Sequence, residues 1–154
     1  MTNGLWHFVH YLTFTMWLGG AVSAMVIGIS MKKMDRGLWG AAVDGQAALY
    51  RMLIGPGAMG VILSGILLTF KMYGKMSGGG ASSWMGTMQG AGVLGALVTL
   101  LFAMPAAAKL TRLEPIGGQE AAFDAQQKRL ATAGSIGGTL GLIALLASAL
   151  FQRV

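Results

Sequence analysis

The chain has 154 residues, of which 55% are apolar and only 10% are charged, a balance that excludes an ordinary soluble domain. It contains no cysteine, which excludes disulfides, thiolate metal sites and a cysteine nucleophile. The net charge of +6 comes from Lys and Arg placed between apolar stretches, without interleaved aromatics, so we expect contact with anionic lipid and no binding of nucleic acid.

Four long stretches carry no charged residue, and each is long enough for a transmembrane helix, which needs about 20 mostly apolar residues. They cover residues 1–31, 52–70, 76–108 and 130–152. The pattern predicts an all-α integral membrane four-helix bundle, forming a single transmembrane domain over residues 1–154 with spans at 5–30, 50–71, 84–108 and 130–151. No positive charge precedes the first apolar run, so we expect it to be a retained span rather than a cleaved signal.

Basic residues predict the orientation of these spans. Four Lys or Arg lie between the first and second uncharged stretches, two between the second and third, and four between the third and fourth. The positive-inside rule then places the first and third connections in the cytoplasm and both termini outside, an N-out/C-out topology in a bacterial-type inner membrane. We expect helical extensions over 35–50 and 120–129, a break at Gly117-Gly118, and a flexible Gly/Ser-rich outer connection over 74–83.

Within the spans, small residues recur at a spacing that lets helices approach closely. The pairs are Gly86 and Gly90, Gly134 and Gly138, and Gly137 and Gly141. We expect them to pack inside one bundle; a homodimer interface on the fourth helix is the alternative. Pro56 and Pro105 lie inside spans and predict local distortions of the second and third helices.

The centres of the spans lack Asp, Glu, Lys and Arg, which argues against an ion-coupled transporter. Nothing resembles a nucleophile beside a base, a phosphate-binding loop or a carboxylate pair, so the sequence offers no catalytic residues. Ser64, Thr99 and Ser135 are expected to bond to carbonyl groups within their own helices or to a neighbouring helix.

Two histidines, His7 and His10, lie three residues apart near the outer end of the first span and hence on one helix face. They are either interfacial anchors or ligands for a metal or haem, because neutral imidazole serves both. The aromatic residues expected at the membrane boundary are Trp6, Tyr11, Trp17 and Trp84.

Methionines flank the outer connection at spacings of four and three. They are Met72, Met76, Met85 and Met88. Thioethers are soft ligands that suit Cu(I), and these would lie on the same side of the membrane as the histidines. Packing in an apolar setting is the alternative explanation for them.

Several short motifs together resemble the copper-resistance D (CopD) type of membrane domain and, more distantly, the HemJ type of protoporphyrinogen oxidase. They are His10 followed by Trp17-Leu18-Gly19-Gly20, then Tyr50-Arg51, Ile54-Gly55-Pro56-Gly57, Ser64-Gly65-Ile66, Trp84 and Pro105. In the oxidase-like relatives a first-helix histidine is tied to haem, together with a lysine and further histidines near the third span. This chain has Gly86, Met88 and Gln89 around that place. The resemblance implies a copper role for His10, which matches the family position and could be joined by the outer methionines, more than it implies oxidase activity.

Three functions therefore remain open. The first is copper handling at the outer membrane face through His7, His10 and the outer methionines. The second is a non-catalytic accessory subunit that packs against a larger membrane complex and holds no cofactor. The third is binding of haem b through His10 as axial ligand.

Overall fold

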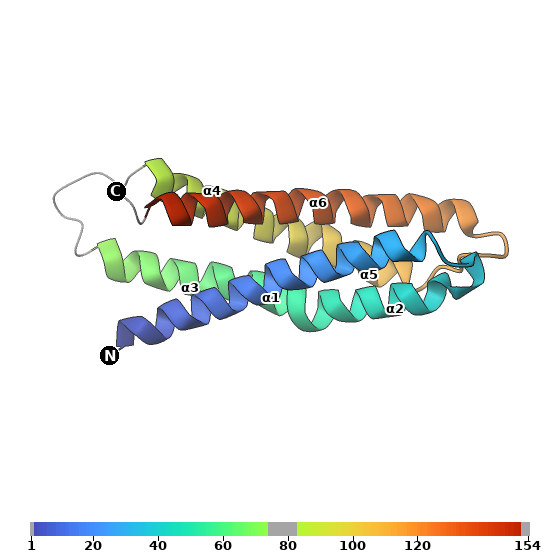
Figure 1. The fold of residues 1–154 in the computed structure, drawn as a ribbon, viewed down its shortest axis with the longest axis horizontal. Helices are drawn as coiled ribbons and strands as arrows, with labels where there is room; N and C mark the ends of the chain where they lie inside the picture. The colour runs from blue at the N-terminus through green and yellow to red at the C-terminus, as the bar shows by residue number, and fades with distance from the viewer. Residues whose placement is uncertain (1, 74–82, 152–154) are drawn as a thin grey trace.

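The computed structural model describes residues 2–73 and 83–151, and within these ranges its regular elements are all helices. In chain order they are α1 (Thr2–Met31), a short 3-10 turn (Arg36–Leu38), α2 (Trp39–Leu49), α3 (Gly55–Tyr73), α4 (Ser83–Val98), α5 (Met104–Leu110) and α6 (Glu120–Phe151). Two π-helical turns, η2 (Tyr50–Ile54) and η3 (Thr99–Ala103), join α2 to α3 and α4 to α5. The helices thus form four long rods (Figure 1).

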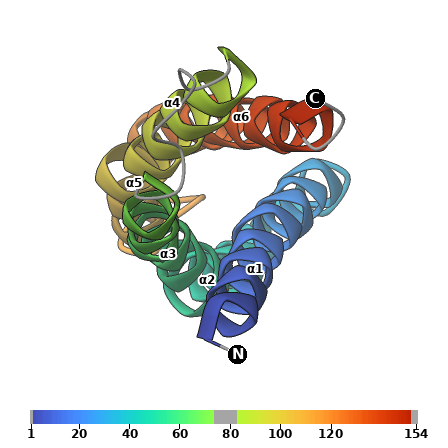
Figure 2. The same ribbon diagram turned by 90° about the vertical axis from the view of Figure 1, so that its left-hand side faces the viewer.

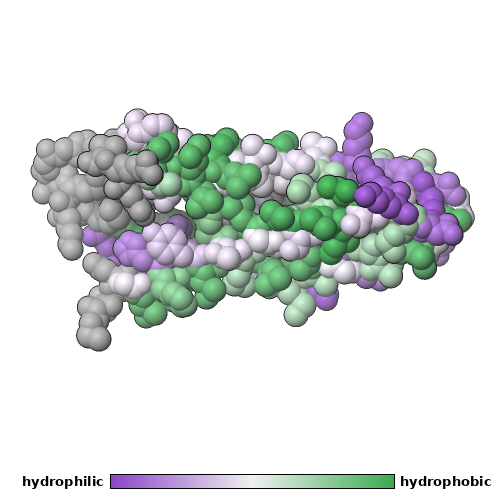
Figure 3. Space-filling model, in the orientation of Figure 1, coloured by the Kyte–Doolittle hydropathy of each residue, from purple (hydrophilic) through white to green (hydrophobic). Residues whose placement is uncertain are grey.

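Each rod is long and apolar enough to cross a bilayer, which makes the chain a multi-pass membrane protein and confirms the predicted all-α four-helix bundle. The apolar ranges are Gly4–Met31, Arg36–Lys71, Ser83–Leu110 and Glu120–Leu150. Hydrophobic side chains cover the middle of the face in Figure 3, and hydrophilic ones gather at the end where α6 begins. The start of α1 and the end of α6 lie together at the opposite end, which we call the terminal end of the bundle (Figure 1).

The distortions predicted at the two prolines take the form of π-helical turns. A proline has no N–H to donate, and a wider turn just before it redirects the neighbouring hydrogen bonds. In η2 the N–H of Gly55 donates to the carbonyl of Tyr50, and in η3 the N–H of Met104 donates to that of Thr99. The two turns meet, since a Cβ on Gly55 would lie 2.6 Å from the sulfur of Met104.

Close helix packing depends on glycines only partly foreseen from the sequence. The most extensive helix contacts are those of α4 with α6 and of α1 with α3. The contacts of α1 with α6 and of α3 with α4 are less extensive. Of the predicted glycines, Gly134, Gly137 and Gly141 lie against other helices. The prediction was wrong for Gly86, Gly90 and Gly138, where an added Cβ would meet no described atom within 4 Å. A spacing of four residues defines a helix face, but it does not say whether that face points inward.

At the end opposite the termini, Arg36 joins the connection between α1 and α2 to the connection between α5 and α6 and to the start of α6. Its Nη2 lies 2.7 Å from the carboxylate of Asp124, and its Nε donates to the carbonyl of Pro115 at 2.7 Å. The guanidinium also stacks 4.9 Å above the ring of Trp39, which in turn packs against the fully buried Phe123. The helical extensions expected over 35–50 and 120–129 are therefore present and folded against each other.

The chain reverses between α5 and α6 at Gly117 and Gly118, as expected for a break there. Their φ angles of 94° and 95° lie in a region that residues with a Cβ rarely adopt. α2 is anchored beside the second half of α1, because Gln46 donates from Nε2 to the carbonyl of Ala24 at 2.8 Å.

Candidate functional site

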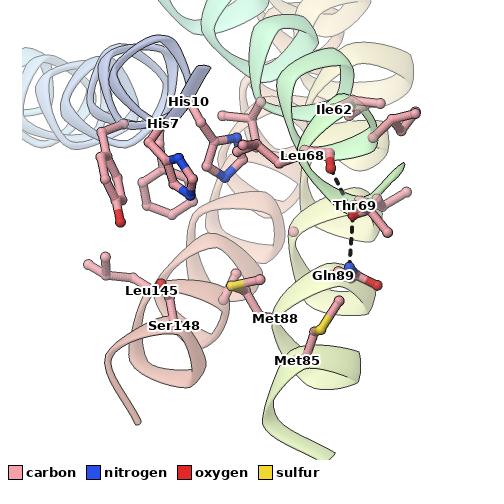
Figure 4. A pocket seen from close by; sticks show the side chains of 18 of the residues that line it. His7, His10, Ile62, Leu68, Thr69, Met85, Met88, Gln89, Leu145 and Ser148 are labelled. Atoms are coloured by element: carbon pink, nitrogen blue, oxygen red, sulfur yellow. Dashed lines mark hydrogen bonds between the residues drawn. The ribbon is translucent and has the colours of Figure 1, made fainter. Parts of the chain in front are cut away.

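A cavity of about 560 Å³ lies between the four rods in the terminal half of the bundle (Figure 4). Its walls come from α1, α3, α4 and α6 and are mostly apolar, with a few polar side chains among them. The polar and sulfur-bearing lining residues are His7, His10, Tyr11, Thr69, Met85, Met88, Gln89 and Ser148. A largely apolar cavity with a few convergent polar groups is the usual form of a small-molecule site.

His10 is held in place by a hydrogen bond to the neighbouring rod. Its Nδ1 lies 2.8 Å from the hydroxyl oxygen of Ser64 on α3. That hydroxyl donates its own proton to the carbonyl of Gly60 one turn earlier, so it accepts the Nδ1 proton of His10. The unprotonated nitrogen of the imidazole is then Nε2. Gly65 lies beside the ring, since a Cβ there would be in van der Waals contact with Cε1 of His10 at 3.4 Å.

The opposite wall is formed by α4. Met85, Met88 and Gln89 face the histidines of α1 across the cavity in Figure 4. Met85 is buried, and Gln89 donates from Nε2 to the hydroxyl of Thr69 on α3 at 2.9 Å. This hydrogen bond joins α3 to α4.

The floor of the cavity lies at the middle of the bundle, where Trp17 is fully buried. Phe14, which lines the cavity, packs edge-on against the Trp17 ring with a centroid distance of 5.8 Å. The indole N–H donates to Thr99 at 3.1 Å, and Thr99 donates to the carbonyl of Gly95 at 2.9 Å. The prediction that Trp17 is an interfacial anchor was therefore wrong. It is a core residue, because glycines on three other rods leave a space of its size.

The other predicted aromatics lie nearer the terminal end. Trp6 is half-buried and lies beneath the ammonium group of Lys71, 5.3 Å from its ring centroid. Tyr11 is 52% exposed although it lines the cavity, and Trp84 is 41% exposed. Lys71 thus provides a positive charge at the end of α3 that borders the cavity.

The structure brings together four of the six predicted ligand residues, namely His7, His10, Met85 and Met88, as lining of one cavity. Met72 lies in the last turn of α3, and Met76 falls outside the described residues. Among residues 2–73 and 83–151 there is no cluster of three or more His, Cys, Asp or Glu side chains suited to a metal ion. Any metal site here would depend on histidine and thioether ligands or on a prosthetic group.

Sequence reasoning missed the contributions of Ser64 and Gln89 to this site. Ser64 was expected to bond to a carbonyl of its own helix or to a neighbouring helix, and it does both, but its partner His10 was not foreseen. Each is an isolated polar side chain within a strongly apolar span, and this was the available signal. Its meaning depends on which residue of another rod lies opposite, which helix spacing alone does not give.

No protein-family model matches the chain, and neither a curated protein nor a solved structure is similar enough to count as a match. The resemblance to CopD-type and HemJ-type proteins remains an expectation from short motifs. The site is therefore interpreted from its own geometry.

Proposed function

We propose that this membrane protein binds haem b in the cavity of the terminal half, with His10 as an axial ligand. The observation that carries the proposal is the hydrogen bond from Nδ1 of His10 to Ser64. Haem-ligating and metal-ligating histidines characteristically donate one ring N–H to a fixed partner, which orients the ring and leaves the other nitrogen as the ligand. His10 has this arrangement on the wall of a cavity.

The size and polarity of the cavity support a porphyrin better than a bare ion. Its volume of about 560 Å³ falls in the range of roughly 300–1,000 Å³ typical of sites for drug-sized organic ligands. A single metal ion would leave most of this space empty. The apolar walls on four helices suit the faces and edges of a large planar ring.

The charges of the ligand and of the cavity wall also favour haem over a bare metal ion. Burying an uncompensated cation in an apolar cavity is costly, and the described part of the cavity wall carries no Asp or Glu. A porphyrin dianion neutralises a ferrous iron, so haem brings its own counter-charge. Its acidic edge would suit the positive charge of Lys71 in the last turn of α3, which rests on Trp6 outside the cavity lining.

Met88 on the opposite wall is the candidate for a second axial ligand, because thioether sulfur together with histidine is a known axial pair. When bound, haem would supply one-electron redox chemistry at its iron. The residues of this chain would orient the imidazole through Ser64 and exclude water with apolar walls and the Trp17 floor.

Copper handling is the second candidate, and one observation favours it: two thioethers, Met85 and Met88, line the same cavity as His7 and His10. Soft sulfur ligands with imidazole suit Cu(I). The two candidates differ in what they require of His7. A copper site needs both histidines, whereas a haem with ligands on α1 and α4 needs only His10.

The test is an absorption spectrum and metal analysis of protein purified in mild detergent, for the wild type and for His7→Ala and His10→Ala separately. Haem binding predicts a Soret band that His10→Ala abolishes and His7→Ala retains. Copper binding predicts stoichiometric copper without a Soret band, lost in both variants. A colourless, metal-free protein that takes up neither added haemin nor Cu(I) would overturn both candidates and leave the accessory-subunit role.

A further inference from the structure

One side of the cavity lies between α1 and α6, which contact each other less extensively than α1 contacts α3 or α4 contacts α6. The two helices make close contact at mid-bundle, where a Cβ on Gly141 would lie 2.6 Å from a methyl carbon of Leu18. Towards the terminal end they diverge, as Figure 2 shows when viewed from that end. The opposite side is joined by the hydrogen bond from Gln89 on α4 to Thr69 on α3.

The rims of this opening are formed by residues that belong to both the cavity and the outer surface. Tyr11 on α1 lines the cavity and is 52% exposed, and Leu145 on α6 lines it and is 48% exposed. Both residues lie inside the apolar ranges Gly4–Met31 and Glu120–Leu150. In a bilayer spanned by these ranges, an opening between the two residues would face lipid chains rather than water.

At the middle of the bundle the cavity ends at Trp17. Trp17 fills the bundle beneath the cavity, and its indole is fixed to Thr99. A Cβ on Gly95 would already lie 3.0 Å from the Trp17 ring, so α4 packs closely against the indole on this side of the cavity.

We propose that the cavity is loaded sideways from the surrounding leaflet, through the opening between Tyr11 and Leu145, by an amphiphile dissolved in the lipid. The proposal rests on the proposed function in taking haem as that amphiphile. It adds the route and the source of the ligand. A flat ring with an acidic edge suits an apolar entrance, and Lys71 supplies a positive charge in the last turn of α3, outside the cavity lining.

The native chain contains no cysteine, so paired cysteines can close one side at a time. The test pair is Tyr11→Cys with Leu145→Cys, joined by a short bis-maleimide. The matched control is Ile66→Cys with Val93→Cys, which also line the cavity and are partly exposed but lie on α3 and α4. Both proteins are reconstituted without haem in phosphatidylcholine vesicles, and uptake of haemin from haemin-loaded vesicles is followed by the Soret band.

Without cross-linker, each cysteine pair provides its own reference rate of haemin uptake, with which the cross-linked form of the same protein is compared. Cross-linking α1 to α6 should slow uptake by about tenfold or more, as closing a gate does, and should slow release equally when applied after loading. The α3–α4 cross-link should change neither rate. Uptake that is unaffected by the α1–α6 cross-link, or slowed equally by both cross-links, would overturn the lateral route. A failure of the uncross-linked proteins to bind haemin at all would instead overturn the proposed function.

Discussion

Trp17 donates its indole N–H to the hydroxyl oxygen of Thr99 across 3.1 Å, which joins the middle of α1 to the π-helical turn after α4. Glycines make this contact possible. A Cβ on Gly57 would lie 2.6 Å from the backbone nitrogen of Trp17, and one on Gly95 would lie 3.0 Å from its ring. The bundle is therefore built around one large side chain and the small residues facing it.

Replacing Trp17 should strongly destabilise the protein. Trp17→Ala leaves a cavity at the centre of the bundle and is expected to cost about 3–5 kcal/mol, as for large aromatic residues in protein cores. Trp17→Phe keeps most of the volume and loses the hydrogen bond, which is expected to cost about 1 kcal/mol. Thermal unfolding in detergent, followed by size-exclusion chromatography, measures both.

Trp84→Ala is the control, since Trp84 is 41% exposed and contributes no buried contact of this kind. It should change the free energy of unfolding by less than about 0.5 kcal/mol. Equal loss of stability in Trp17→Ala and Trp84→Ala would contradict the core position of Trp17.

Two adjacent glycines on α6 provide a matched pair. A Cβ on Gly137 would lie 2.5 Å from the hydroxyl oxygen of Thr99, whereas one on Gly138 would meet no described atom within 4 Å. Gly137→Ala should therefore cost about 1–3 kcal/mol by overpacking. Gly138→Ala should be neutral or slightly stabilising, because alanine loses less backbone entropy on helix formation. The same unfolding assay applies, and a reversed order of the two variants would rule out this packing.

The orientation of the bundle can be tested with single cysteines. Basic residues predict that the terminal end faces outward. Ser83→Cys, at the start of α4, should then react with a membrane-impermeant maleimide in intact cells. Lys33→Cys, between α1 and α2, should react only after permeabilisation. The opposite labelling pattern would mean that the protein has both termini in the cytoplasm.

The ion pair between Arg36 and Asp124, at the end of the bundle opposite the termini, should contribute little to the free energy of unfolding. Arg36 and Asp124 are 34% and 52% exposed in their side chains, and exposed pairs contribute about 0.2–1 kcal/mol. Arg36 also donates to the carbonyl of Pro115, and Arg36→Ala removes both contacts. We expect Asp124→Asn to cost less than Arg36→Ala, and the effect of Asp124→Asn to shrink in high salt. A double-mutant cycle of the two residues measures the coupling directly.

The four spans and their helical extensions could be predicted because charge and apolar length depend on local sequence alone. The placement of Trp17 could not, since a tryptophan in an apolar span serves equally well as an interfacial anchor or as a core residue. Its role is decided by Gly57, Gly95 and Gly141 on three other rods, each of which would place a Cβ within 3.4 Å of Trp17. The sequence likewise did not predict π-helical turns, although Pro56 and Pro105 indicated where a distortion would occur.

The same limit applies to the site. The histidines and two of the methionines were identified by residue type, and they do share one cavity. That cavity exists only because four rods surround it. The positions of its polar side chains depend on hydrogen bonds between rods, such as that of Gln89 with Thr69. No periodicity within a single helix predicts such pairs.

Ser64 provides the sharpest test of how His10 is used. Its hydroxyl accepts from Nδ1 of His10 at 2.8 Å and so sets which ring nitrogen faces a ligand. Ser64→Ala should weaken haemin binding by roughly 10–100-fold, the usual effect of removing the partner of a ligating histidine. The Soret band should also shift or broaden, because an untethered imidazole adopts several orientations.

Ser23→Ala is the matched control. The Ser23 hydroxyl donates to a carbonyl one turn earlier, as that of Ser64 does, but it lies on the exposed face of α1 and is not part of the cavity lining. Haemin titrations of both variants separate a general effect of losing a helix hydroxyl from the specific effect on His10. Ser64→Thr keeps a hydroxyl and should restore much of the affinity. Equal affinities for Ser64→Ala, Ser23→Ala and the unmodified chain would mean that the hydrogen bond to His10 supports only the packing of α1 against α3.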